Sequence, residues 1–283
     1  MSYLVFAVIC SVLVSVLLKL ARRYAWDVGQ MVTWNYLVAA GLCALLLKPS
    51  LASLQQPHAP WAALLALAVI LPTIFLVLGR AIAVAGIVRS DVAQRLSLLL
   101  SLIAAFALFG EQAGLLRLAG LALGLLAILA ITARSGAQAQ SAGSWRWLLG
   151  VWVGFALVDV LLKQVALSGT PSMAALLVSF SLAFVLMLAL QVARHATGKT
   201  RLTVRDLGAG ALLGLLNFGN IFFYVRAHQQ LAGSPATVFA GMNIGVVVLG
   251  ALAGLFVFGE RISAWNRVGL GLAVIAIGMI AAG

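Results

Sequence analysis

The chain has 283 residues, of which 64% are apolar and only 8% are charged. Soluble domains are about 45–50% apolar and about 25% charged, so this composition excludes a soluble globular protein. It also excludes a disordered chain, because disordered chains are poor in apolar residues. The net charge of +12 does not indicate nucleic-acid binding, because the lysines and arginines stand singly between apolar runs. The remaining class is a polytopic membrane protein.

Ten apolar blocks follow one another, each close to the ~20 residues that a membrane-spanning helix needs. The first block has no basic leader before it and no cleavage site after it, so we expect an uncleaved helix. The sequence predicts an all-α membrane protein with ten transmembrane helices. Their expected ranges are residues 2–20, 30–47, 61–79, 92–109, 113–132, 147–167, 172–193, 207–225, 235–258 and 265–282.

A hydrophilic linker, residues 134–146, divides the chain into halves of five helices each, residues 1–133 and 147–283. The halves share short motifs in the same order: Val-Leu-Leu-Lys ending at Lys19 and Lys163, Arg-Ala starting at Arg80 and Arg226, and Phe-Gly-Glu at 109–111 and 258–260. Because five is odd, the second half must lie inverted in the membrane. An inverted 5+5 repeat is typical of transporters whose binding site lies near the midplane between the halves.

With these features the whole chain resembles the drug/metabolite transporter superfamily, in its ten-helix EamA-type branch. The resemblance rests on the two five-helix halves and on the Phe-Gly-Glu that closes the fourth and ninth helices, at 109–111 and 258–260. It implies alternating-access transport of a small organic metabolite, often the export of amino acids or related compounds.

The first helix also resembles that of the small multidrug resistance transporters, in which a proton-binding glutamate lies two turns before a lysine. Here Lys19 is present, but Ser11 occupies the glutamate position. Phe155 occupies the matching position of the second half. Proton-coupled extrusion of cationic drugs by that route is therefore not expected.

Asp159 and Lys163 lie well inside the sixth block, four residues apart and so on one helix face. A charge at membrane depth costs about 2.5–3.5 kcal/mol, so it needs a partner or a water-filled cavity. The two residues are either a structural ion pair or part of a substrate site, in which Asp159 is the coupling candidate. Lys19, which matches Lys163 in the repeat, is either an interface anchor or part of that site.

The fourth block is short, and the polar run 90–95 precedes its apolar part. Gln94 matches Asn243 in the second half, and polar residues at matching places of short helices indicate a transport site. Gln94, Arg95 and Asn243 are therefore candidate substrate ligands. The alternative is that Asp91 caps the helix and Arg95 pairs with it four residues on.

Further polar residues occur within or at the ends of the third and eighth blocks. Asn217 and Asn220 either bind substrate or form hydrogen bonds between helices. Arg80 and Arg226 are expected to anchor their helices at the interface or, with Asp91, to act as gating charges. The candidate internal charges are mostly cationic, which favours an anionic or zwitterionic substrate.

The remaining ionisable residues offer no catalytic set. Glu111 and Glu260 are expected to cap or order helix ends. His58, His195 and His228 are too scattered for a metal site. With six acidic residues and three histidines, the sequence indicates neither an enzyme nor a cofactor.

Glycines four residues apart recur in several blocks, and such pairs favour close helix–helix contact. The pairs are Gly120/Gly124, Gly150/Gly154, Gly210/Gly214, Gly241/Gly245 and Gly250/Gly254. They predict where helices pack most tightly.

Two arguments about orientation conflict. Loops after the odd-numbered blocks hold most of the lysines and arginines, so the positive-inside rule places both termini outside the cytoplasm. The family resemblance implies cytoplasmic termini.

The expected function is secondary transport, as an exporter, of a small anionic or zwitterionic metabolite such as an amino acid. The expected partners are this small molecule and the lipid bilayer of a bacterial inner membrane, without nucleic acid, and a homodimer is left open. The alternatives are a flippase for lipid headgroups or lipid-linked sugars, and a scaffold that does not transport. A scaffold would not need the inverted repeat.

Overall fold

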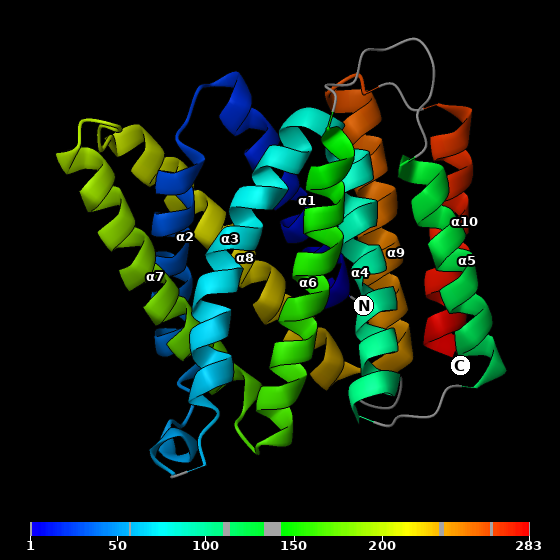
Figure 1. The fold of residues 1–283 in the computed structure, drawn as a ribbon, viewed down its shortest axis with the longest axis horizontal. Helices are drawn as coiled ribbons and strands as arrows, with labels where there is room; N and C mark the ends of the chain where they lie inside the picture. Colours follow the sequence, from blue (N-terminus) through cyan, green and yellow to red (C-terminus); the bar gives the residue numbers. More distant parts are fainter. Residues whose placement is uncertain are drawn as a thin grey trace. The chain divides into compact units, whose positions relative to one another are not determined.

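The computed structural model describes residues 2–56, 58–109, 114–132, 143–231, 235–260 and 263–282, and these residues are helical apart from turns and loops (Figure 1). The α-helices are α1 Ser2–Arg23, α2 Val28–Leu42, α3 Trp61–Ala85, α4 Ile87–Phe109, α5 Leu115–Thr132, α6 Ser144–Leu167, α7 Ser172–Ala196, α8 Val204–Gln230, α9 Pro235–Leu252 and α10 Ala264–Ala282. Short π-helical turns continue α2 (η1, Cys43–Leu47) and α9 (η3, Ala253–Val257), and the 3-10 turn η2, Ala52–Gln55, follows α2.

Within the described ranges, eight helical segments are long and apolar enough to cross a membrane: α1, α2 with η1, α3, α6, α7, α8, α9 with η3, and α10. Helix α5 has a shorter apolar stretch, Leu115–Ala127. Helix α4 carries Arg89, Asp91 and Arg95 close to its start. These segments confirm the prediction of an all-α membrane protein.

The start of α4 differs from the expectation. The helix begins at Ile87 and continues to Phe109, so it is not short, and Asp91 lies in its second turn. The prediction that Asp91 caps the helix is therefore wrong. Gly86 explains the early start, because its positive φ of 91° lets the chain pass from α3 into α4 through a single residue.

The helices form two compact units, and each unit draws on both halves of the sequence. Unit 1 comprises residues 1–19, 77–156 and 219–283, and unit 2 comprises residues 20–76 and 157–218. Helices α1, α3, α6 and α8 contribute to both units. Most of the predicted linker, 134–146, lies outside the described residues.

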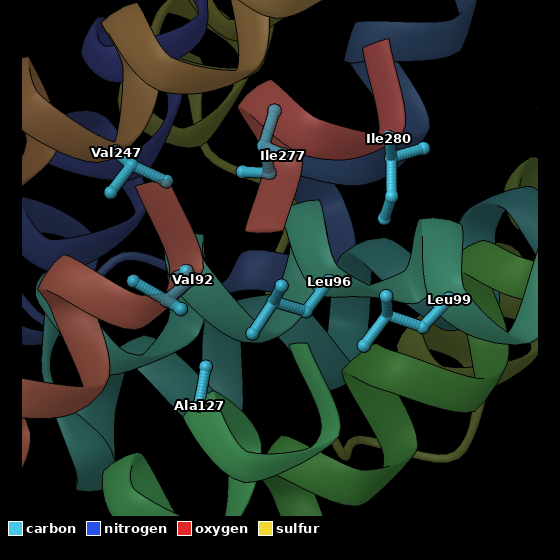
Figure 2. Close-up of a cluster of buried hydrophobic side chains, with 8 residues drawn as sticks. Val92, Leu96, Leu99, Ala127, Val247, Ile277 and Ile280 are labelled. Carbon is cyan, nitrogen blue, oxygen red and sulfur yellow. The ribbon is translucent and has the colours of Figure 1, made fainter. Parts of the chain in front are cut away.

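The core of unit 1 lies among α4, α5, α9 and α10. Helices α5 and α10 run side by side in Figure 1. Figure 2 shows their buried side chains with those of α4 and α9: Val92, Leu96, Leu99, Ala127, Val247, Ile277 and Ile280. Gly120 and Gly124 permit this packing, because a Cβ at these positions would lie 2.8 Å from Ile280 Cγ1 and 2.7 Å from Leu99 Cδ1 respectively.

Helix α9 and the turn η3 that continues it carry four paired glycines, which contact two different helices of unit 1. Gly241 and Gly245 lie against Leu4 and Val8 of α1. One turn after these contacts, Gly250 lies against the Asp91 carboxylate of α4. Gly254, in η3, lies against Val88 of α4. The prediction that these glycine pairs mark close contacts is confirmed.

Unit 2 is built on the packing of α2 against α7. Tyr36 of α2 is fully buried, with its ring centroid 6.0 Å from that of Phe75 and 5.6 Å from that of Phe180. Helix α8 approaches α2 so closely that a Cβ on Gly210 would lie 2.7 Å from the Met31 carbonyl oxygen. A Cβ on Gly214 would lie 2.7 Å from the Asn35 carbonyl oxygen.

Candidate functional site

One face of α1 carries three polar residues at successive turns: Ser11, Ser15 and Lys19. Their spacing of four residues places them above one another on the helix surface. Ser11 and Ser15 are buried, and the Lys19 side chain is 23% exposed. All three bind polar groups from distant parts of the chain that belong to unit 1.

Ser15 contacts Asp91 at the middle of this face. Its hydroxyl donates to Asp91 Oδ1 at 2.6 Å. Asp91 is only 1% exposed, and its other oxygen, Oδ2, lies against Gly250 without a hydrogen-bond partner in the described part of the chain. A carboxylate buried in this way is costly, because burial removes the water around both oxygens and only one hydrogen-bond donor replaces it.

Ser11 contacts Arg95, one turn further along α4. The Arg95 guanidinium donates from Nη2 to Ser11 Oγ at 2.8 Å. A hydroxyl bound to a guanidinium therefore lies at this turn of α1.

Lys19 forms an ion pair with Glu260, which follows η3. Lys19 Nζ donates to Glu260 Oε1 at 2.9 Å and to the Ile82 carbonyl at 3.4 Å. The same carboxylate accepts from the backbone N–H groups of Ile87 at 2.8 Å and Val88 at 3.3 Å. Glu260 therefore caps the first turn of α4 from a distant part of the chain. It accepts from N–H groups that have no partner within α4.

These contacts form one continuous polar seam, and we use this name for Ser11, Ser15, Lys19, Asp91, Arg95 and Glu260. Ser11 of α1 contacts Arg95 of α4. Ser15, one turn later in α1, contacts Asp91, one turn earlier in α4, so the two helices run antiparallel. The seam holds two positive and two negative groups. It joins the first sequence half to the Phe-Gly-Glu motif of the second.

The seam brings together three residues that the sequence singled out, Lys19, Asp91 and Arg95. Ser15 was not singled out in the sequence, and Ser11 was noted only for the absence of an acid at its position. Ser15 and Ser11 lie four and eight residues before Lys19, and this spacing on one helix face was the signal that could have found them. The expected capping role of Glu260 is confirmed, although it caps α4. Glu111 lies outside the described residues.

The predicted amides are distributed over both units. Gln94 is half-buried, and its backbone carbonyl accepts from the Ser97 hydroxyl. Asn243 is buried and donates to the Phe239 carbonyl of its own helix. Asn220 belongs to unit 1 and has a buried Oδ1 without a hydrogen-bond partner in the described residues.

In unit 2, Asn217 donates from Nδ2 to Asn35 Oδ1 at 3.2 Å, which joins α8 to α2. This contact is the hydrogen bond between helices that the sequence left as one alternative for Asn217. Its role in substrate binding remains a prediction.

The helix-end arginines lie on aromatic rings of unit 1. Arg80 is exposed, 5.9 Å from the Trp147 ring centroid. Arg226 is exposed, 5.3 Å from the Phe222 ring centroid, and donates to Gln229 Oε1. A guanidinium over an aromatic ring is the arrangement that suits an interface anchor.

Asp159 and Lys163 are placed on α6 within unit 2. Asp159 is exposed and Lys163 is half-buried. An exposed residue on a membrane-spanning helix contacts either lipid or a water-filled space. A charged side chain there needs the water-filled space or a partner of opposite charge. Both roles of this pair, the structural ion pair and the substrate site, stay predictions.

A second polar cluster lies at one end of unit 2, centred on Asp27. Asp27 caps α2 by accepting from Gly29 N at 2.8 Å and Gln30 N at 3.3 Å. Arg194 forms an ion pair with its Oδ2 at 3.1 Å, and Thr200 donates to the same oxygen at 3.0 Å. Burial raises the pKa of Asp27, but the hydrogen bonds from Arg194 and Thr200 outweigh it, so the pKa lies below the ordinary value.

The same cluster ties the loop between α7 and α8 to the start of α2. Gln30 Nε2 donates to the Arg201 carbonyl at 2.8 Å. Asp27 N donates to Asp206 Oδ1 at 3.0 Å, and Asp206 also accepts from Thr203 Oγ1. Asp27 was not singled out in the sequence, although its place before a helix is typical of a cap. Among the described residues, no three histidine, cysteine or acidic side chains gather as metal ligands.

The fold and the seam together define an all-helical integral membrane protein with paired charges between its helices. A Haemophilus influenzae protein described as uncharacterized is 41% identical over 287 residues, covering 98% of this chain and 96% of that protein. The chain belongs to the same family as this Haemophilus influenzae protein. No family model matches this chain. A solved crystal structure of a protein with 17% identity has the same fold at a TM-score of 0.57, covering 99% of this chain and 96% of the other.

Proposed function

We propose that this protein is a secondary transporter, of the drug/metabolite transporter type, for a small anionic or zwitterionic metabolite. The observation that carries the proposal is the polar seam. It holds Asp91 and Glu260 with Lys19 and Arg95 at the helix contacts of a protein that is only 8% charged. Ionisable groups among membrane-spanning helices are costly, and they mark substrate or ion pathways.

The pairing of helices supports an inverted 5+5 repeat, in which α1–α5 would correspond to α6–α10. Within unit 1, α4 packs on α9 and α5 packs on α10. Within unit 2, α2 packs on α7. A pseudo-two-fold axis produces this pattern, because helices close to the axis meet their own counterparts.

Two further contacts of unit 1 fit the same symmetry. Cys10 of α1 lies against Gly219 of α8, and Arg80 of α3 lies over Trp147 of α6. In the proposed repeat, α1 corresponds to α6 and α3 corresponds to α8. The contact of α1 with α8 is therefore the counterpart of the contact of α6 with α3. We propose that α4 and α5 also span the membrane, and that the membrane is a bacterial inner membrane.

Arg95 is the seam residue best suited to a substrate carboxylate or phosphate, because a guanidinium offers several donors in a planar array. Counterflow in proteoliposomes tests the proposal, with labelled amino acids, organic acids, nucleosides and sugars as probes. We expect saturable counterflow of an anionic or zwitterionic compound. Replacement of Arg95 by Gln should reduce it about tenfold or more.

Lys199→Gln is the matched control, because Lys199 is exposed in the loop between α7 and α8 of unit 2, whereas the seam belongs to unit 1. This variant should transport like the native protein. Saturable transport of quaternary ammonium dyes, without competition from amino acids or organic acids, would contradict the proposed substrate class. Scrambling of labelled lipids without any counterflow would show a flippase.

A further inference from the structure

We propose that Asp91 is a proton-binding site, and that its protonation controls how firmly α1 is held to α4. The coupling of this step to substrate rests on the proposed transport function, whereas the binding of a proton does not. Asp91 thereby takes the coupling role that the sequence predicted for Asp159.

The two oxygens of Asp91 have different surroundings. Oδ1 accepts from Ser15 at 2.6 Å, which is within the range of hydrogen bonds from a hydroxyl to an ionised carboxylate. Oδ2 is buried and has no hydrogen-bond partner in the part of the chain that the structure describes. The second oxygen is therefore a place where a proton can be added without breaking an existing contact.

The charged groups around Asp91 are bound to other residues. On α1, Lys19 pairs with Glu260 at 2.9 Å. On α4, Arg95 donates to Ser11 and Arg89 donates to Asn266 Oδ1.

Helix α9, which contacts Asp91 through Gly250, has no ionisable side chain between 235 and 252. Glu260 adds a negative charge nearby. Within the described residues Asp91 forms no ion pair, so its charge is stabilised mainly by one hydroxyl and by the more distant Arg95.

A proton on Oδ2 would change two free energies in opposite directions. It would remove the cost of burying a charge, because a neutral carboxyl is far cheaper to bury. It would also convert the bond from Ser15 into a neutral hydrogen bond, which is about half as strong. Proton uptake therefore weakens the contact between α1 and α4, and proton release restores it.

Gly250 makes this switch possible on the side of α9. A Cβ at this position would overlap Asp91 Oδ2, so the glycine leaves room for the carboxyl in its observed position. The proton site thus lies where α1 and α4 of the first sequence half meet α9 of the second. A group at this junction can transmit its protonation state to the relative position of three helices.

The direct test uses the proton itself as the probe. The purified protein is titrated between about pH 5 and 9, and infrared difference spectra record the carbonyl stretch of protonated carboxyl groups. We expect a titrating band that disappears in Asp91→Asn and persists in Asp159→Asn. A titrating band that persists in Asp91→Asn and disappears in Asp159→Asn would overturn the inference, as would the absence of any titrating band.

Ser15→Ala provides a second readout if Asp91→Asn does not fold. Loss of the hydroxyl removes the one donor to the charged form, so the midpoint of the titration should move to higher pH by about one unit. An unchanged midpoint in Ser15→Ala would contradict a functional Ser15–Asp91 contact. Gly271→Ala is the matched structural control, because a Cβ there meets no atom within 4 Å.

Transport measurements separate this inference from the proposed function. With a labelled amino acid or organic acid that shows counterflow, Asp91→Asn should lose accumulation driven by a pH gradient. Accumulation unaffected in Asp91→Asn would overturn the coupling while leaving the transporter proposal intact. A titrating Asp91 band in a protein that exchanges none of the probes would support the proton site and contradict the proposed function.

Discussion

Asp27 shows how a single carboxylate can organise one end of a helical unit. It caps α2, pairs with Arg194 of α7 and receives the Thr200 hydroxyl from the following loop. Each of these contacts favours the ionised form, and together they lower the pKa despite burial. The chain has only six acidic residues, so few other groups contribute to its behaviour in acid.

This lowered pKa predicts a loss of stability in acid. A carboxyl whose pKa is lower in the folded state stabilises the fold above its unfolded pKa of about 3.9, and that stability is lost as the pH falls through the folded pKa. We expect the midpoint of thermal unfolding in detergent to fall between about pH 5 and 3, and to fall less steeply in Asp27→Asn.

Asparagine is the matched replacement for Asp27, because it caps helices about as well as aspartate but cannot form the ion pair. Asp27→Ala removes the cap as well and should cost a further ~0.5–2 kcal/mol at neutral pH. Equal pH slopes in the native protein and in Asp27→Asn would show that the ion pair with Arg194 contributes nothing.

Asp159 and Lys163 permit a test between a structural and a transport role. Replacing both members of an ion pair by neutral groups is often close to neutral for stability, whereas removing one leaves a lone charge. We expect Asp159→Asn with Lys163→Gln to insert, to purify as a monodisperse species and to show little counterflow. Normal flux in this double variant would return the pair to a structural role.

At the scale of helices, the glycines decide which faces meet. On α8, Gly210 lies directly against the backbone of α2, while Gly208 has no atom within 4 Å of an added Cβ. The backbone atoms of Met31 cannot move aside as a flexible side chain can. The two glycines therefore lie two residues apart on one helix, but only Gly210 is packed against another helix.

Gly210→Ala should destabilise the protein by about 1–3 kcal/mol, the usual cost of overpacking. Gly208→Ala should be neutral or stabilising by up to ~1 kcal/mol, because alanine has the higher helix propensity. Thermal unfolding of the two purified variants in one detergent measures the difference. Equal melting temperatures would show that α8 does not lie this close to α2.

At the scale of the molecule, unit 2 brings two basic segments to the same end. The contacts of Asp27 and Gln30 tie the start of α2 to the loop between α7 and α8. Arg22 and Arg23 end α1, just before Asp27, while Lys199, Arg201 and Arg205 lie in or beside that loop. The positive-inside rule assigns such an end to the cytoplasm.

This assignment predicts termini outside the cytoplasm if all ten helices cross the membrane. A reporter active only in the periplasm should therefore be active when fused to the C-terminus. A reporter that fluoresces only in the cytoplasm should remain dark at the same position. The reverse result would show that the orientation implied by the family resemblance is correct.

Most of the helices could be predicted from the sequence, because a membrane-spanning helix depends on a local property. An apolar run of about 20 residues has a favourable transfer free energy wherever it occurs, and its backbone hydrogen bonds are satisfied within the run. Lys19 and Arg95 could be recognised for the same reason, because the apolar residues around each charge are its neighbours in the sequence. The glycine pairs could likewise be recognised as contact points.

The partners of these residues were decided only by the tertiary structure. Ser15 binds a carboxylate 76 residues away, and Lys19 binds one 241 residues away. The first turn of α4 is likewise capped by Glu260, which lies 173 residues after Ile87 in the chain. A sequence shows that a charge among apolar helices must be compensated, because that cost is local. Which distant group compensates it depends on how the helices pack, since only packing brings residues so far apart in the chain within hydrogen-bonding distance.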